Sequence, residues 1–256
     1  MGCHMLARAI VRRPGESLRR ALTTAHLGSP DPVVALRQHH AYCEALARCG
    51  LHLTVLDEDP AFPDGCFVED TAVVTDRVAI ITRPGAVSRR GEEVSIANVL
   101  GFHRPLVRVE APATLDGGDV LEIEGHYLVG LSGRTNRRGA EALGAALEAA
   151  GHTWEPVVVP RGLHLKGLVT YAGQGAVVVS PHLASHPALA DLRRVVVDPA
   201  EDLAANTLEV NGKLLVAKGF ARTRRALVKA GFDLQELALG EFHKVDGALT
   251  CLSLRF

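Results

Sequence analysis

The sequence predicts an α/β fold, a five-bladed αβ propeller of pseudo-fivefold strand–strand–helix–strand repeats. Pairs of apolar strands, each followed by a helical segment, recur four times, and their second strands are centred at Ile80, Leu128, Val178 and Leu215. One further strand remains at each end of the chain. Pairing these two terminal strands completes a fifth blade and closes the ring without an unpaired edge. An ordinary open α/β sheet is the alternative.

The composition describes a chain that can bury a sizeable core unaided. Its 256 residues include 47% hydrophobic and 22% charged residues, with a formal net charge of -1. This balance excludes a general attraction to nucleic acid or anionic membranes, and no apolar run suits a signal peptide or a membrane span. The five cysteines form no CxxC pair, so no disulfide framework or structural zinc site is expected. We therefore expect one soluble, cytoplasmic domain over residues 1–256.

The first elements follow from turn and capping residues. Residues 7–11 form a short apolar run before a Pro-Gly turn, which predicts a strand. Asp31 followed by Pro32 is typical of a helix start, and a glycine ends the segment, so a helix is expected over 32–49. Residues 51–56 then predict a strand.

The four repeats follow, each with two strands around a short turn and then a helix. The expected strand pairs are 67–75 with 78–82, 120–123 with 127–130, 169–172 with 176–180, and 208–210 with 214–218. The expected helices are 88–100, 136–150, 187–193 and 223–230, and a further strand is expected at 106–110.

The C-terminal stretch places a cysteine shortly after a glycine turn. Asp246-Gly247 ends one segment, and the alternation from Leu249 to Arg255 predicts a terminal strand. A thiol near the start of that strand would lie at the end of a sheet, where a nucleophile is accessible. The alternative for Cys251 is a small buried residue, because free cysteines pack as hydrophobes.

Polar side chains from the blades are expected to meet at the ring axis, which the first strand of each blade faces. Buried acidic groups without partners are costly, so their convergence predicts a cationic guest or neighbouring arginines. The candidates are Glu69, Asp70, Asp116, Asp119, residues 164–170, Asn206 and Cys251.

Six short blocks occur in order along the chain. They are F-V-E-D at 67–70, R-P-G-A at 83–86 with R-R-G-E at 89–92, L-D-G-G-D-V at 115–120, G-L-S at 130–132 with R-T-N at 134–136, L-H-L-K at 163–166, and V-D-G at 245–247 with T-C at 250–251. Together they resemble the dimethylarginine dimethylaminohydrolase family of the pentein superfamily, over nearly the whole chain except Met1 to Met5. The resemblance implies the five-bladed pentein fold. It also implies hydrolysis of Nω-methylated arginines, asymmetric dimethylarginine and monomethylarginine, to citrulline and dimethylamine or methylamine through a covalent cysteine intermediate.

The resemblance implies a catalytic set of Cys251, His164 and Asp116. Resonance stabilises a guanidinium carbon, so its hydrolysis needs a strong nucleophile, and the thiolate of Cys251 fits that role. His164 would protonate the departing amine and then deprotonate the attacking water, because its pKa lies near working pH. Asp116 would orient His164 and favour its charged form. The alternative for Asp116 and Asp119 is that each carboxylate caps backbone amides of the turn at Gly117-Gly118. We expect this structural role for Asp119.

The remaining implied residues would bind a substrate with a cation at one end and an amino acid group at the other. Charge-assisted hydrogen bonds would hold the carboxylate. A solvated basic helix start is the alternative for Arg89 and Arg134. The implied sites are Asp70 with Glu69 for the guanidinium, Arg89 and Arg134 for the α-carboxylate, Asp64 with the carbonyls of Leu22 and Val245 for the α-ammonium, and Phe67 as a wall.

Lys166 bears on substrate choice. Arginine deiminases resemble this chain but carry an acid two residues after the catalytic histidine, where it accepts hydrogen bonds from the nitrogen that leaves as ammonia. Dimethylation removes both N–H donors of that nitrogen, so a site without this acid tolerates the methyl groups. We therefore expect methylated arginines to be preferred over arginine in kcat/KM, and Lys166→Asp to narrow this gap mainly by weakening turnover of the methylated substrates. If Lys166 points away from the site and merely marks the family, the variant is expected to change stability alone.

The resemblance implies that the protein needs no cofactor. It also implies that the protein binds a small-molecule substrate, a methylated arginine, rather than nucleic acid or a membrane. A homodimer is compatible with the sequence. Thiolate and imidazole also bind Zn²⁺, so inhibitory zinc at Cys251 and His164 is a hypothesis, without zinc being required. The alternatives are an arginine deiminase or another amidine hydrolase of the same fold and, outside enzymes, an arginine-responsive binding protein or a zinc-binding pentein with an idle site.

Overall fold

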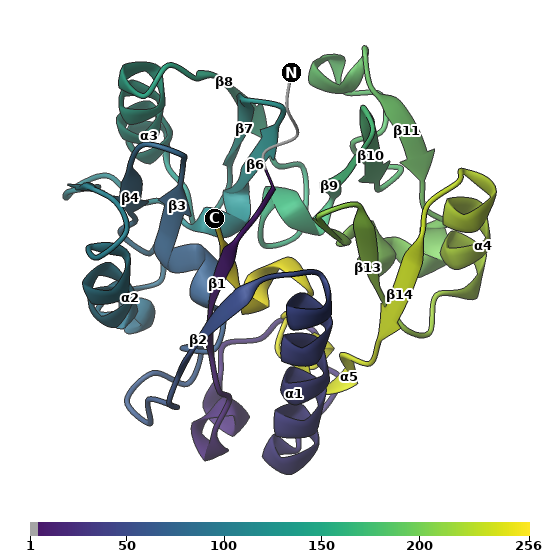
Figure 1. Ribbon diagram of the computed structural model, residues 1–256, viewed down its shortest axis with the longest axis horizontal. Coiled ribbons are helices and arrows are strands. Elements are labelled where there is room, and N and C mark those ends of the chain that lie inside the picture. The colour runs from purple at the N-terminus through teal and green to yellow at the C-terminus, as the bar shows by residue number, and fades with distance from the viewer. Residues whose placement is uncertain (1–4) are drawn as a thin grey trace.

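Five three-stranded sheets surround a common axis in the computed structural model, which describes residues 5–256 (Figure 1). Met1 to His4, most of the stretch outside the family resemblance, lie outside the described residues. In every sheet the central strand pairs antiparallel with one neighbour and parallel with the other. This arrangement confirms the predicted five-bladed αβ propeller.

The blades follow one another along the chain. The first blade holds β1 (Arg8–Arg12), β2 (His52–Leu56) and β15 (Leu254–Arg255). The next two are β3 (Ala72–Val74), β4 (Ala79–Ile81) and β5 (Leu106–Arg108), then β6 (Val120–Ile123), β7 (His126–Leu131) and β8 (Thr153–Val158). The last two are β9 (Val169–Gly173), β10 (Ala176–Val179) and β11 (Arg193–Val196), then β12 (Leu208–Val210), β13 (Lys213–Ala217) and β14 (Leu234–Leu237).

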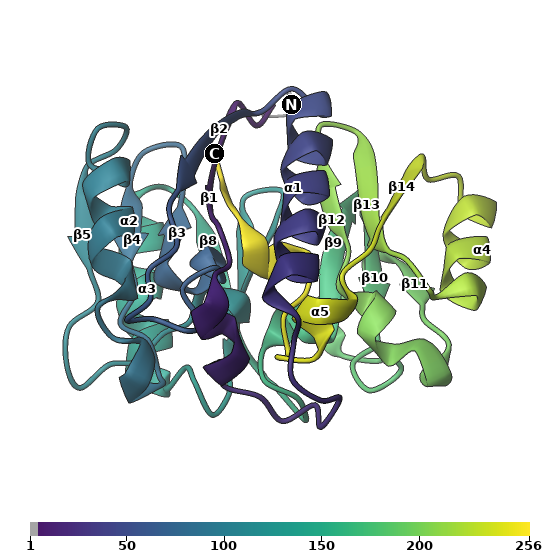
Figure 2. The ribbon, with the colours of Figure 1, turned by 90° about the horizontal axis from the view of Figure 1, so that it is seen from below.

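The two ends of the chain close the ring within the first blade. β15 pairs antiparallel with β1, with Arg255 opposite Ala9. The carbonyl of Phe256 also accepts hydrogen bonds from the N–H groups of Ala7 and Arg8, at 3.1 and 2.8 Å. β1 and the C-terminal segment therefore run side by side in both views (Figures 1 and 2), as the sequence predicts.

Helices lie around the periphery of the ring (Figure 1). In three blades a helix stands between the second and third strands in chain order, whereas the first helix connects β1 to β2. Asp31 caps the first helix as predicted, because its Oδ1 accepts hydrogen bonds from the N–H groups of Val33 and Val34 at 2.9 and 3.2 Å. Asn136 caps the third in the same manner. The helices are α1 (Pro32–Arg48), α2 (Glu92–Leu100), α3 (Arg137–Ala149), α4 (Ala221–Lys229) and a short α5 (Gly240–His243).

The fourth blade departs from the predicted repeat. The helix expected over 187–193 is wrong: the structure has a single 3₁₀ turn, Pro187–Leu189, and β11 begins at Arg193. The side chain of His186 starts this turn by accepting a hydrogen bond from the N–H of Ala188 at 3.2 Å. The short distance between this cap and β11 leaves no room for a helix of stable length.

Cys251 lies on a 3₁₀ turn, Thr250–Leu252, and the predicted strand is limited to β15. The N–H of Thr250 donates a hydrogen bond to Oδ1 of Asn206 at 3.1 Å, and its hydroxyl donates to Oε2 of Glu69 at 2.8 Å. Side chains of other blades thus satisfy the polar groups that a neighbouring strand would otherwise pair. The prediction of a strand at Cys251 is therefore wrong.

Apolar side chains gather between neighbouring blades. Residues 5–256 contain five buried apolar clusters, one between each pair of adjacent blades. Between the second and third blades, for example, Ile80 and Val129 pack with Leu143 and Leu147 of α3, and all four are fully buried. The ring axis is thereby left to polar residues. No helix in the described part of the chain combines the length and apolar character needed to cross a membrane.

Candidate active site

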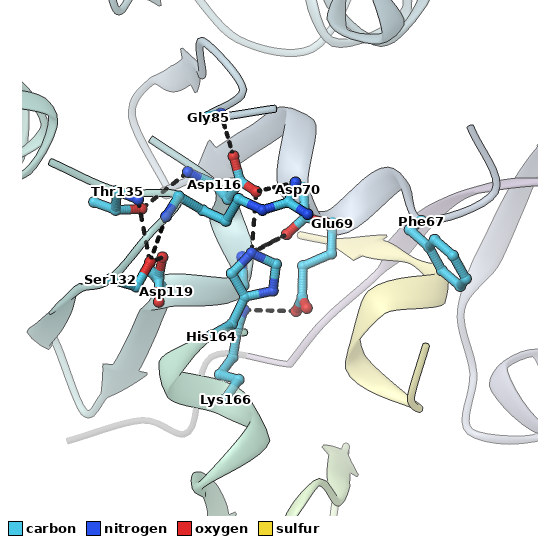
Figure 3. Close-up of polar contacts among 12 residues, drawn as sticks. Phe67, Glu69, Asp70, Gly85, Asp116, Asp119, Ser132, Thr135, His164 and Lys166 are labelled. Atoms are coloured by element: carbon cyan, nitrogen blue, oxygen red, sulfur yellow. Dashed lines mark hydrogen bonds and ion pairs between the residues drawn. The ribbon is translucent and has the colours of Figure 1, made fainter. Parts of the chain in front are cut away.

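A cavity of about 190 Å³ lies near the ring axis, with walls from several blades. Asp116 and Glu69 do not line it: Asp116 contacts His164 from behind, and Glu69 contacts Lys166 (Figure 3). Of the other axial candidates, Asp119 and Asn206 also lie outside its lining. The remaining catalytic and substrate-binding residues that the resemblance implies all line it, namely Leu22, Asp64, Phe67, Asp70, Arg89, Arg134, His164, Val245 and Cys251.

His164 lies against two carboxylates (Figure 3). Its Nε2 is 3.0 Å from Oδ2 of Asp116, a hydrogen bond, and 3.9 Å from Oδ1 of Asp70. Gly118 permits this approach, because a Cβ there would lie 2.6 Å from Nδ1 of His164 and 2.9 Å from Oδ1 of Asp70. The N–H of Gly118 instead donates to that oxygen at 2.9 Å. The two carboxylates therefore fix the orientation of the imidazole.

Asp116 is fully buried and is itself held by two loops. Its Oδ1 accepts a hydrogen bond from the N–H of Gly85, in the loop after β4, at 2.8 Å. Its own N–H donates to Oγ1 of Thr135, in the loop after β7, at 3.1 Å. These contacts aim the second carboxylate oxygen at His164.

Asp119 supports the same histidine through the backbone. It accepts a hydrogen bond from the N–H of Leu165 at 2.9 Å and another from the hydroxyl of Ser132 at 2.6 Å. The sequence predicts that Asp119 caps the amides of its own turn, but its partners lie in neighbouring loops. Asp119 therefore fixes the chain immediately after His164.

The charges around His164 favour its protonated form. Burial lowers the pKa of His164, but the charge of Asp70 and the hydrogen bond that His164 donates to Asp116 outweigh burial and raise this pKa to about 9. Burial raises the pKa of Asp70, but His164 and Arg89 outweigh it and bring this pKa down to about 2. At neutral pH the site thus holds an imidazolium beside an ionised carboxylate, which is a proton donor held in place.

Cys251 lies on the wall of the same cavity. Burial raises the pKa of its thiol to about 12, and the carboxylates of Glu69 and Asp70 add to the rise, whereas Lys166 opposes it. Among the four cysteines in residues 5–256, Cys251 is the one that lines this cavity. At neutral pH the thiol of Cys251 is therefore protonated.

Arg89 also lines the cavity, but most of its donors are engaged. Its Nη1 donates to Oδ2 of Asp70 at 2.6 Å, and its Nη2 donates to the carbonyl of Phe67 at 3.0 Å and to Oε2 of Glu92 at 2.7 Å. Arg89 thus holds Asp70 in place. Our sequence analysis missed Glu92, for which the signal is the Arg-x-x-Glu spacing at the start of α2.

Arg134 brings a free donor to the cavity. Its Nη1 is buried without a hydrogen-bond partner, and Oδ2 of Asp116 lies 4.0 Å away. A buried N–H without a partner is costly, so this atom is a candidate for binding an anionic group. Asp64 offers the opposite charge: it accepts a hydrogen bond from the N–H of Leu22 at 3.2 Å, and burial raises its pKa.

Phe67 supplies an apolar part of the wall. Its ring packs edge-on against Phe242, with the ring centroids 6.3 Å apart. A Cβ at Gly247 would lie 2.3 Å from this ring, so the glycine leaves the room that the ring occupies.

Two loops on the cavity wall contain residues that our sequence analysis missed. Thr23 and Thr24 come from the loop before α1, and Asp246 comes from the loop before Cys251. Asp246 accepts hydrogen bonds from the N–H of Thr24 at 2.5 Å and from its hydroxyl at 3.0 Å. The hydroxyl of Thr23 donates to the carbonyl of Lys244 at 2.8 Å. Asp246 was the available signal, but we interpreted it only as a turn residue.

Three of these side chains have the spacing of metal ligands. One ligand atom each of Asp70, Asp116 and His164 lie within 4.8 Å of one another. A metal there would have to displace the proton of His164 and compete with Arg89 for Asp70. Cys251 is not in this group, so the zinc hypothesis for Cys251 and His164 stays a prediction.

The chain is similar over nearly its whole length to proteins of known name, although no protein-family model matches it. A protein of Pseudomonas aeruginosa named N(G),N(G)-dimethylarginine dimethylaminohydrolase is 39% identical over 254 residues, 98% of this chain and 100% of the relative. A protein of the same name from Streptomyces coelicolor is 39% identical over 250 residues, 97% of this chain and 96% of the relative. A solved structure of the P. aeruginosa protein, a cysteine-to-serine variant with citrulline, has a TM-score of 0.96 and 38% identity, covering 98% of this chain and 100% of that one.

Proposed function

The chain belongs to the dimethylarginine dimethylaminohydrolase family, and we propose that it hydrolyses Nω-methylated arginines to citrulline and dimethylamine or methylamine through a covalent intermediate on Cys251. The observation that carries this proposal is that Cys251, His164 and Asp70 line one cavity, and that Asp116 is hydrogen-bonded to His164. Citrulline, which the P. aeruginosa relative holds, is the product expected of this reaction.

The first half of the reaction forms a carbon–sulfur bond. The thiolate of Cys251 attacks the guanidinium carbon, and the bond from this carbon to the methylated nitrogen breaks. The imidazolium of His164 gives its proton to that nitrogen, which leaves as the neutral amine. Asp116 holds the ring and stabilises its charged form.

The second half releases the product. His164, now neutral, takes a proton from water while the water oxygen adds to the carbon of the thiouronium intermediate. The carbon–sulfur bond then breaks and the new hydroxyl group on the carbon gives its proton to solvent, which yields citrulline, the thiolate of Cys251 and a protonated His164. One histidine thus serves first as acid and then as base.

The substrate's own charge explains how a thiol with a raised pKa can react. Burial together with Glu69 and Asp70 holds the pKa of Cys251 at about 12. A guanidinium placed against Asp70 offsets these negative charges and brings a positive charge near the sulfur, which lowers the pKa of the thiol. The thiol therefore gives its proton to solvent and becomes a thiolate when substrate is bound.

The amino acid end of the substrate meets groups of matching charge. Nη1 of Arg134 binds the α-carboxylate, because it is a buried donor without a hydrogen-bond partner. Arg89 adds a second contact and otherwise holds Asp70. The α-ammonium group is bound by Asp64 with the carbonyls of Leu22 and Val245, and Phe67 packs against the aliphatic chain.

Citrulline formation from dimethylarginine, monomethylarginine and arginine, measured side by side, tests the proposal. We expect both methylated substrates to exceed arginine in kcat/KM, because position 166, which holds an acid in arginine deiminases, is a lysine here and does not line the cavity. Faster hydrolysis of arginine than of either methylated form would contradict the proposal and favour the arginine deiminase alternative.

The structure changes the expectation for Lys166. Its Nζ donates to Oε1 of Glu69 at 2.6 Å, and it does not line the cavity. Lys166→Asp places a carboxylate against buried Glu69, and breaking a buried ion pair costs about 3–5 kcal/mol. We expect the melting temperature to fall by about 10 °C, while the ratio of kcat/KM for dimethylarginine to that for arginine stays within about twofold of wild type, a change of under about 0.5 kcal/mol.

Lys166→Arg keeps the charge and is the matched control for this experiment. A ratio that moves toward arginine in Lys166→Asp, with an unchanged melting temperature, would instead place position 166 beside the substrate.

We further propose that the chain forms one catalytic domain and works in the cytoplasm. The described cysteines are free thiols, which suits a reducing compartment.

We also propose that the protein forms a homodimer. The apolar side chains of Val94, Phe102 and Val107, in the second blade, are exposed, and they support self-association through this blade. Light scattering on wild type and Phe102→Ser will measure the mass, and a monomeric wild type would refute the homodimer.

A further inference from the structure

A closed circuit of hydrogen bonds lies behind the cavity, and Figure 3 shows its contact between Lys166 and Glu69. Nζ of Lys166 and the hydroxyl of Thr250 donate to the two carboxylate oxygens of Glu69, at 2.6 and 2.8 Å. Nδ2 of Asn206 donates to the hydroxyl of Thr250 at 3.0 Å and to the carbonyl of Lys166 at 2.9 Å. The N–H of Thr250 returns a hydrogen bond to Oδ1 of Asn206 at 3.1 Å. None of the four residues is among those that line the cavity within residues 5–256.

The circuit joins the two segments that carry the proposed catalytic groups. Thr250 directly precedes Cys251, and Lys166 lies two residues after His164, each on its own 3₁₀ turn. Glu69 and Asn206 come from other parts of the ring, just before β3 and β12. Both therefore contact one segment with the nucleophile and one segment with the acid–base group.

We infer that Glu69 and Asn206 are positioning residues, which set the separation between the sulfur of Cys251 and the imidazole of His164 by holding Thr250 and Lys166. This inference rests on the proposed roles of Cys251 and His164. It also replaces the expectation that Glu69 lines the guanidinium site, because Lys166 and Thr250 occupy its carboxylate outside the cavity.

Burial makes this circuit rigid. Glu69, Asn206 and Thr250 are 3%, 4% and 3% exposed. A buried amide, hydroxyl or carboxylate is costly without its partners, so another rotamer of any of them would break at least two hydrogen bonds with no water to replace them. The circuit therefore favours one relative placement of its two 3₁₀ turns.

A separate contact keeps the Cys251 turn folded when the circuit is broken. The hydroxyl of Tyr42 donates to the carbonyl of Leu249 at 3.0 Å and lies 2.6 Å from Oγ of Ser253, on either side of Cys251. Loss of the circuit will thus shift the turn relative to His164 rather than unfold it. A displacement of this kind, near 1 Å, can slow a reaction about a hundredfold.

Thr250→Val tests the inference, because it keeps the size of the side chain and removes the hydroxyl that links Glu69 to Asn206. We expect kcat for dimethylarginine to fall about tenfold to a hundredfold, with KM within twofold of wild type, because the substrate contacts are untouched. Thr250→Ser, in contrast, keeps a hydroxyl at this position and is expected to keep kcat close to that of wild type.

Ser180→Ala is the matched control for a lost buried hydroxyl. Ser180 donates to Asp202 at 2.5 Å and accepts from the N–H of His182 at 3.3 Å, away from the cavity lining. We expect it to lower the melting temperature without lowering kcat. A loss of kcat in Thr250→Val that Ser180→Ala shares would be a general stability effect and would overturn the inference.

The remaining outcomes also decide the question. An unchanged kcat in Thr250→Val, or a rise in KM alone, would overturn the positioning role. If Thr250→Val does not fold, Asn206→Asp, which keeps the acceptor and removes both donors, is expected to show the same loss of kcat at constant KM. Failure of both variants to fold would make the circuit a folding element instead. A wild type that forms no citrulline from dimethylarginine would count against the proposed function, and the variants would then be compared on the arginine analogue that it does hydrolyse.

Discussion

Cys251→Ser is expected to lower kcat by at least about 10⁴-fold while dimethylarginine still binds. The hydroxyl is far less ionised and less nucleophilic than a thiol whose ionisation a bound guanidinium promotes, so it does not attack this carbon at a useful rate. The groups proposed to hold the substrate, Asp70, Arg134 and Asp64, are unchanged. Citrulline formation and titration calorimetry measure the two effects separately.

Mass spectrometry then identifies the nucleophile directly. Acid-quenched wild type is expected to carry the substrate-derived adduct on the peptide that contains Cys251. Cys43→Ser is the matched control, since Cys43 is also a partly buried free thiol but lies on α1, and its variant should keep both turnover and adduct. An adduct on another cysteine, or an active Cys251→Ser variant, would refute the assignment.

His164→Gly is expected to lower kcat by about 10²–10⁴-fold, the usual contribution of a general acid–base group. Without an imidazole to activate water, the covalent intermediate should break down more slowly than it forms. Adduct on Cys251 should therefore accumulate above the level in wild type. Rapid quenching followed by intact-mass measurement gives the adduct fraction over time.

Asp116→Asn provides the comparison for His164→Gly. It keeps the imidazole but removes the hydrogen-bonding carboxylate that raises the pKa of His164. We therefore expect a smaller loss of kcat than in His164→Gly, with less adduct. Full steady-state activity of His164→Gly would refute its acid–base role.

Local signals account for the part of the fold that could be predicted. Asp31 predicts the start of α1, because a capping side chain accepts hydrogen bonds from N–H groups only two and three residues away. The turn between β12 and β13 needs left-handed backbone at Asn211 and Gly212, with φ of 49° and 89°, and asparagine and glycine adopt it readily. Caps and turns of this kind depend on neighbouring residues in the sequence, so they can be predicted without knowledge of tertiary contacts.

The missed features depend on contacts between distant segments. The alternating pattern around Thr250 predicts a strand. In the structure Thr250 lies on a 3₁₀ turn, because Glu69 and Asn206 satisfy its hydroxyl and N–H groups in place of a neighbouring strand. Glu69 and Asp70 are adjacent acids that the sequence treats alike. In the structure Asp70 lines the cavity and Glu69 joins the circuit behind it, because consecutive side chains point in different directions. Resemblance could bring these residues to the site but could not place their atoms.

The pairing of β15 with β1 has a consequence for the order of assembly. Arg255 lies opposite Ala9, so this contact joins residues at opposite ends of the chain and raises the contact order. The entropy lost on closing so long a loop exceeds that for the hairpins of single blades. We expect those hairpins to form earlier during refolding, while the segment with Cys251 is still free. Catalytic competence would then be acquired only at the step that closes the ring, after most of the secondary structure has returned.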